Sequence, residues 1–90
     1  MTSRCPPIHP GEILRLDFLE PLNLSQMQLA RALHVPATCV NNIVRGKRGV
    51  TGEMALRLGR YFGTGPEFWM NVQARYNLDV AEDANAARQA

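Results

Sequence analysis

The side chains best suited to specific chemistry lie in one short stretch, residues 37–45. Asn41 and Arg45 are four residues apart, so a helix would place both on one face. An asparagine amide can both donate to and accept from the edge of an adenine, and an arginine can donate twice to a guanine. The outward side chains of such a helix would be small, polar or basic, with no acid among them: Ala37, Thr38, Asn41, Asn42 and Arg45.

Two short helices joined by a tight turn are predicted over residues 25–46, and they would hold these side chains. Ser25 and Gln28 have the spacing of a capping box at the start of the first helix. Pro36 suits the first turn of the second helix, and Gly46 follows where a left-handed cap is expected. Apolar residues repeat at helical spacing on the inward side of the pair: Met27, Leu29, Ala30, Leu33, Val40, Ile43 and Val44.

Positive charge is concentrated in the middle third of the chain. Residues 31–60 carry six cations and one acid, whereas residues 1–30 and 61–90 have net charges of −1 and −2 within a total of +2. Lys47 and Arg48 lie between two glycines directly after the second helix, which predicts a flexible basic loop. Such a loop would contact phosphates, and the local charge suits a polyanion better than a small acidic ligand.

Three further helices are predicted around this pair. One begins at Pro10, with the residue before it acting as a cap, and stops before Pro21. Another begins after Thr51 and ends at Gly63, and the last begins with a second capping box at residues 64–67. A chain of 90 residues encloses a small core, so association with a second copy would add stability.

The predicted last helix carries more aromatic surface than a small domain can bury alone. Its large side chains follow at intervals of one, three and four residues, which is first of all a packing signal. Packing within the core alone is therefore the alternative. We expect part of this stripe to pack in the core and part to contact a second copy, and the predicted dimer contacts are Phe68, Trp69, Val72 and Tyr76.

The chain is expected to form one domain with polar ends. Residues 1–8 are predicted to be an extended arm, residues 9–78 the folded domain, and residues 79–90 a polar tail that is either a frayed helix or disordered. The first residues lack the apolar core of a secretion signal, and no apolar run is long enough to cross a bilayer. These features predict a cytoplasmic protein with reduced cysteines and no membrane contact.

An enzymatic or metal centre is the weakest interpretation of the sequence. The soft ligands Cys5, His9, His34 and Cys39 do not have the paired short spacings of a structural zinc site. A pairing of His9 with Glu12 has no third ligand at suitable spacing, so capping is the expected role of both. No nucleophilic side chain and general base are spaced along the sequence so that a helix or turn would bring them together. We expect no catalytic activity, cofactor, metal ion or small-molecule substrate.

The pair of helices resembles the helix-turn-helix of the lambda-repressor and Cro type. Two further stretches, together with the length of the chain, narrow the resemblance to HigA-type antitoxins of the XRE-like family: IHPGEIL at 8–14 and GKRGVTGEMALRLGRYFGTGPEFWMNVQARYNL at 46–78. This implies an all-α, five-helix, lambda-repressor-like fold that forms a homodimer, which we expect to use the C-terminal helix. It also implies binding to a palindromic operator in its own promoter and neutralisation of a HigB-like mRNA-cleaving toxin. The alternative is a stand-alone XRE-type transcriptional regulator without a toxin partner.

The resemblance also implies a DNA-binding surface. It comprises the outward positions of the second helix, the basic loop after it, and the first residue of the supporting helix, which touches a phosphate in this superfamily. The predicted DNA-binding residues are therefore Gln26, Ala37, Thr38, Asn41, Asn42, Arg45, Lys47 and Arg48.

Two positions depart from the family pattern. His34 occupies the turn position where the family usually has glycine, and a positive φ there would have an energetic cost. Pro36 and Ala37 replace a polar pair that the family often has at the start of the second helix, which is the recognition helix of the pair. Because these replacements remove donors, we expect the two asparagines and the arginine of that helix to carry more of the base reading.

Overall fold

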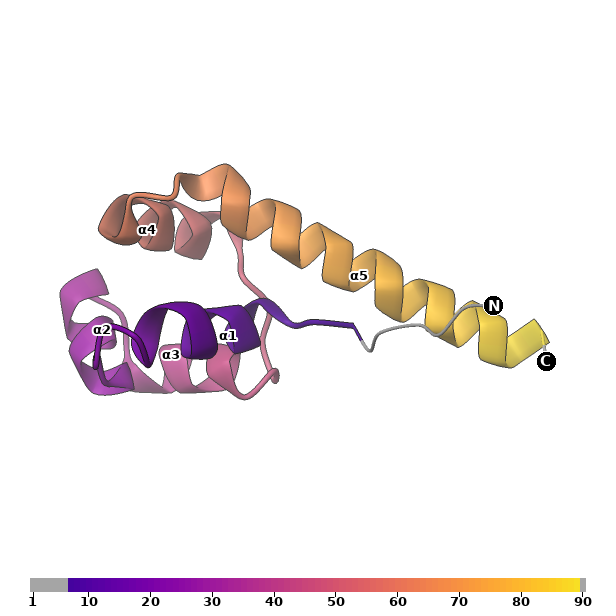
Figure 1. Ribbon diagram of the computed structural model, residues 1–90, viewed down its shortest axis with the longest axis horizontal. Coiled ribbons are helices and arrows are strands. Elements are labelled where there is room, and N and C mark those ends of the chain that lie inside the picture. The colour runs from indigo at the N-terminus through magenta and orange to yellow at the C-terminus, as the bar shows by residue number, and fades with distance from the viewer. Residues whose placement is uncertain (1–6, 90) are drawn as a thin grey trace.

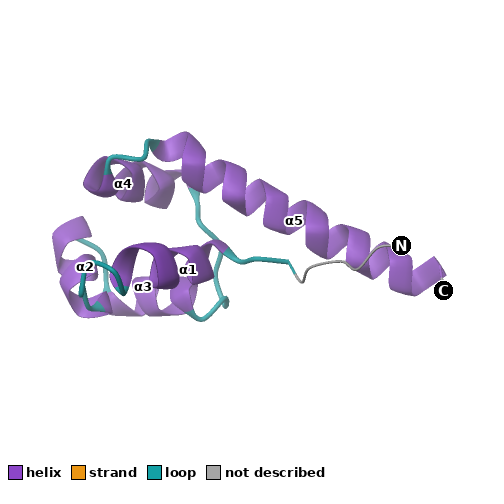
Figure 2. Ribbon diagram, viewed as in Figure 1, coloured by secondary structure: helices purple, strands orange, loops and turns teal. Residues whose placement is uncertain are grey.

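The computed structural model describes residues 7–89, and within that range every regular element is a helix (Figure 2). None of these helices is long and apolar enough to cross a membrane. The predicted all-α fold with five helices is confirmed, with a π-helical turn, η1, added between the first two. In order, the elements are α1 (Pro10–Ile13), η1 (Leu14–Leu19), α2 (Gln26–Leu33), α3 (Ala37–Val44), α4 (Gly52–Phe62) and α5 (Pro66–Gln89).

The helices lie in two layers (Figure 1). One layer holds α1, α2 and α3, and the other holds α4 and the first half of α5, while the second half of α5 extends beyond both layers. The principal extents of 45 × 23 × 22 Å reflect this projecting helix. Within the layers, α4 packs chiefly against α5, and α2 packs chiefly against α3.

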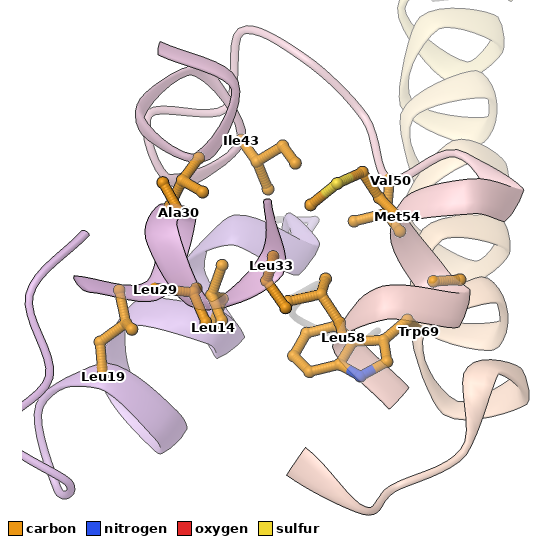
Figure 3. Close-up of a cluster of buried hydrophobic side chains, with 12 residues drawn as sticks. Leu14, Leu19, Leu29, Ala30, Leu33, Ile43, Val50, Met54, Leu58 and Trp69 are labelled. Carbon is orange, nitrogen blue, oxygen red and sulfur yellow. The ribbon is translucent and has the colours of Figure 1, made fainter. Parts of the chain in front are cut away.

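One apolar core lies between the layers (Figure 3). Its largest fully buried side chains come from five different elements, so each element is fixed relative to the others by packing. The helix-turn-helix pair is therefore held against α4 and α5 by the same cluster that stabilises the domain. The largest of these side chains are Leu14, Leu29, Ile43, Leu58 and Trp69.

Met27, expected on the inward side of its helix, is exposed, and Leu16 and Tyr61 are exposed as well. Met27 and Tyr61 lie about a third and about a quarter of a turn, respectively, from the centre of the buried stripe of their helices. Leu16 is displaced by η1, because a π-helical turn bonds residues five apart and so brings Leu14 and Leu19 to one face. Sequence periodicity based on 3.6 residues per turn cannot detect that change.

The predicted cap of the supporting helix is present. Ser25 Oγ accepts from the Gln28 amide at 3.0 Å, and Gln28 Oε1 accepts from the Ser25 amide at 2.9 Å. Thr51 Oγ1 accepts from the Met54 amide at 3.3 Å at the start of α4. Left-handed residues follow α2, α3 and α4, where His34, Gly46 and Gly63 have φ of 59°, 77° and 74°. The non-glycine His34 therefore does adopt the strained turn conformation.

The second predicted capping box is wrong. α5 begins at Pro66, so Thr64 lies two residues before the helix instead of capping it. The Thr64 hydroxyl accepts from Trp69 Nε1 at 2.9 Å and donates to the Gly65 carbonyl at 3.0 Å. Thr64 thus satisfies the indole donor of a buried tryptophan.

The predicted polar tail is helical as far as the structure describes it. α5 continues without a break to Gln89, and Arg75 pairs with Asp79 at 2.9 Å across one turn. Of the two alternatives for residues 79–90, the helix is the one observed through residue 89. Most of the predicted arm, residues 1–6, lies outside the described residues.

Candidate nucleic-acid interface

Helix α3 has two faces of opposite character. Val40 and Ile43 are completely buried against the core, as predicted. Thr38 and Arg45 are exposed, on the side of the helix opposite this buried stripe. The helix is therefore anchored by its apolar side and presents a hydroxyl and a guanidinium to solvent.

The two asparagines of α3 lie at the edges of this exposed stripe and are half-buried. Asn41 Nδ2 donates to Gln26 Oε1 at 2.9 Å, a bond between the supporting helix and the proposed recognition helix. An amide nitrogen carries two hydrogens, so Asn41 keeps its second N–H and its Oδ1 for another partner. The hydrogen bond orients the Asn41 amide, a feature that sequence reasoning missed although it singled out both residues.

The basic loop after α3 is tied back to the protein. The carbonyl of Asn42 accepts from the amides of Lys47 and Arg48, at 2.9 and 3.2 Å. Both basic side chains are exposed. The flexible loop expected from the two glycines is thus a turn with bonded backbone amides, and only its side chains are presented to solvent.

His9 lies between the start of α1 and this loop. Its Nδ1 accepts from the Gly11 amide at 2.9 Å, which confirms the predicted capping role. Because Nδ1 accepts, the neutral ring carries its proton on Nε2. Burial lowers the pKa of His9, while the nearby Arg48 backbone and the Glu12 charge oppose that shift. The ring also lies edge-on to Tyr76, with centroids 4.8 Å apart.

Folding stability should fall as the pH is lowered below about 6.5, the ordinary pKa of histidine. Because the pKa of His9 is lower in the folded chain, the unfolded chain binds more protons in this range. The stabilisation from neutral His9 is present above that pH and is lost below it. Urea unfolding at pH 7.5 and 5.5 measures the loss, and His9→Asn, which can still cap but does not titrate, should show a smaller loss. Equal losses in both proteins would contradict this role.

Arg57 has a structural role that sequence reasoning did not find. Its Nη1 donates to the carbonyl of Leu33 at 2.7 Å, at the end of α2, and its Nη2 donates to Glu53 at 2.9 Å. A cation at the C-terminus of a helix satisfies unpaired carbonyls and opposes the negative end of the helix dipole. The Glu53–Arg57 spacing of four residues was the available signal, but the Leu33 contact spans 24 residues.

The four predicted dimer contacts have different environments. Trp69 is 0% exposed within its own chain, so its assignment as a dimer contact is wrong: the core covers it completely. Phe68 is 37% exposed, and Val72 and Tyr76 are half-buried. An apolar groove of about 370 Å³ lies beside α5, lined by Ile8, Ile13, Phe68, Asn71, Val72, Arg75 and Asp79. Dimerisation through α5 stays a prediction.

The described residues that were considered as metal ligands do not lie together. Within residues 7–89, no three His, Cys, Asp or Glu side chains are placed to hold a metal ion together. Cys39 is a half-buried free thiol in α3, packed against the core, and Cys5 lies outside the described residues.

Comparisons with known proteins agree with this architecture. A helix-turn-helix family model matches residues 17–69. The chain is 53% identical to virulence-associated protein I of Dichelobacter nodosus, over 89% of this chain and 74% of that protein. It is 55% identical to the Pseudomonas aeruginosa antitoxin HigA solved with the higBA promoter, with a TM-score of 0.87 over 91% of this chain and 89% of that one. It is 44% identical to the antitoxin GraA solved with its operator, with a TM-score of 0.86 over 98% and 89% of the two chains.

The two structure matches, which cover 91% and 98% of this chain, include the helix-turn-helix, the basic loop and most of α5. The members of this family are DNA-binding antitoxins and regulators, not enzymes. The chain belongs to the XRE-like helix-turn-helix family and, within it, to the HigA-type antitoxins.

Proposed function

We propose that this protein binds a palindromic operator as a homodimer, represses the operon that encodes it, and neutralises a HigB-like mRNA-cleaving toxin. The observation that carries the DNA-binding part is the two-faced helix α3, with Val40 and Ile43 buried and Thr38 and Arg45 exposed. A helix held in this way can enter the major groove with its polar side toward the bases. The related HigA and GraA structures, solved with promoter and operator DNA, support the same role.

The polar side chains of this surface divide into two roles. Arg45 and Asn41 are proposed to contact base edges, a guanine and an adenine respectively, and Thr38 a thymine methyl or a phosphate. The basic loop and Gln26 are proposed to contact phosphates, which position the helix without reading sequence. Gln26 would thereby link a phosphate to the base contact of Asn41 through their 2.9 Å hydrogen bond.

A dimer is needed because one small domain reads too few base pairs. Two copies related by a twofold axis would read half-sites about one helical turn apart, and that symmetry requires a palindrome. The exposed part of the α5 stripe, around Phe68 and Val72, is the proposed contact between copies. Trp69 has no part in it.

Two alanine variants should separate base reading from phosphate contact. Asn41→Ala should lose about 1–3 kcal/mol of discrimination at particular base pairs. Lys47→Ala should instead weaken all duplexes alike and lower the salt dependence by about one unit of slope for each subunit of the dimer. Fluorescence anisotropy with the upstream DNA, single-base variants of it and an unrelated duplex, over a salt series, measures both effects. Binding that does not depend on salt, or no binding to any duplex, would overturn the proposal.

Toxin neutralisation is supported by the names of the relatives and by a surface left free by the other contacts. The outer side of α1 and η1 exposes Glu12, Arg15, Leu16 and Asp17, a mixed charged and apolar surface. We propose this side as the toxin contact. Co-expression with the neighbouring gene product, followed by co-purification and a growth test, checks it. If the two proteins do not associate, the chain is a stand-alone XRE-type regulator and the DNA-binding part is unaffected.

A further inference from the structure

The basic loop between α3 and α4 is held at both ends by other elements. At its start, the His9 ring lies 3.9 Å from where a side chain at Gly46 would begin and close to the Arg48 backbone. At its end, the amide of Val50 donates to Gln73 Oε1 at 2.7 Å, across 23 residues of sequence. Together with the two bonds to Asn42, these contacts leave the loop little conformational freedom.

The Gln73 side chain is itself held in one orientation. Its Nε2 donates to Asn77 Oδ1 at 3.0 Å, one turn further along α5, so its oxygen faces the loop. Gly49 makes this approach possible, because a Cβ there would lie 2.9 Å from Gln73 Oε1. A buried amide that loses its acceptor is destabilised, so removing the Gln73 oxygen should open this end of the loop.

We propose that Gln73 of α5 and His9 before α1 are positioning residues for DNA binding. They contact no DNA, but they fix the loop so that Lys47 and Arg48 are directed outward before DNA arrives. A loop that is already ordered in the free protein does not have to be ordered when DNA binds, so the binding free energy does not include that entropic cost. The proposal rests on the phosphate-contacting role assigned to this loop above, and it makes α5 part of the DNA-binding apparatus as well as the proposed dimer contact.

The decisive variant is Gln73→Met, which keeps the length of the side chain and removes both amide groups. Hydrogen exchange of the Val50, Lys47 and Arg48 amides should become faster while far-UV circular dichroism stays that of a folded helical protein. Binding to the operator and to an unrelated duplex should weaken by the same factor. The slope of log K against log salt should fall by about 0.9 for each phosphate that the loop no longer neutralises.

A double-mutant cycle separates positioning from general damage. In a Lys47→Ala/Arg48→Ala background, Gln73→Met should have no further effect on binding, because it acts only through those two side chains. An equal loss in both backgrounds would overturn the proposal. His9→Asn, which can still cap α1 but removes the ring that lies beside Gly46, gives an independent second variant and should shift the salt slope in the same direction.

The result also distinguishes this inference from the proposed function. If the wild-type protein binds no duplex, the proposed function fails. If it binds, and the Lys47→Ala/Arg48→Ala protein binds more weakly while Gln73→Met and His9→Asn bind normally, the positioning role alone fails.

Discussion

Replacing Arg45 by alanine should abolish most of the preference for the operator over unrelated DNA. Arg45 is exposed at the end of α3, where its planar fork can donate two hydrogen bonds to a guanine. Such a contact contributes about 1–3 kcal/mol of discrimination, and a dimer makes it twice, so the expected loss is about 2–6 kcal/mol. Competition binding between operator and unrelated duplex at fixed salt measures this loss.

Arg45→Lys is the matched control, because it keeps the charge and loses the bidentate geometry. It should bind unrelated DNA almost as well as the wild type while losing discrimination at one base pair in each half-site. A uniform loss on every sequence in both variants would instead make Arg45 a phosphate contact, and the base reading would then fall to Asn41 and Thr38.

Replacing Trp69 by alanine should cost about 3–5 kcal/mol of folding stability, a large share of the total for a small domain. The side chain is completely buried, lies 5.1 Å from Phe18 and 5.0 Å from Phe68 between ring centroids, and donates to Thr64. Removing it would leave a cavity between the two layers. Urea unfolding at two protein concentrations measures the change in the free energy of unfolding. After the concentration-dependent contribution of dimerisation is subtracted, this change should be the same at both concentrations.

Phe68→Ala is the control on the neighbouring residue. Because Phe68 is partly exposed, its removal should reduce folding stability less than the removal of Trp69. If Phe68 contacts a second copy, the variant should shift sedimentation toward the monomer. A Trp69→Ala protein that keeps its stability and loses only association would contradict the assignment of Trp69 to the core.

Much of the candidate site was predictable because its determinants are local. The Ser25–Gln28 box, the left-handed Gly46 and the burial of Val40 and Ile43 each depend on residues within a few positions of one another. Propensity and helical periodicity report that range of interaction. The family resemblance added the promoter and toxin expectations, which no local pattern contains.

Other features could not be predicted because they join residues that are distant in sequence. A Cβ at Gly11 would lie 1.8 Å from the carbonyl oxygen of Ile43, so α1 crosses α3 at a distance that only glycine allows. The flexible loop was predicted from two glycines, yet its rigidity comes from His9, Asn42 and Gln73 on three other segments.

The sequence by itself determined the helices, most of their caps and which side of α3 is polar, because each of these depends on short-range geometry. The tertiary structure decided that Trp69 belongs to the core, that Gln26 orients Asn41 and that α5 holds the basic loop. Those outcomes depend on how the two layers meet, and the same periodic pattern is compatible with either a core or an interface position. Packing against other elements is what distinguishes the two.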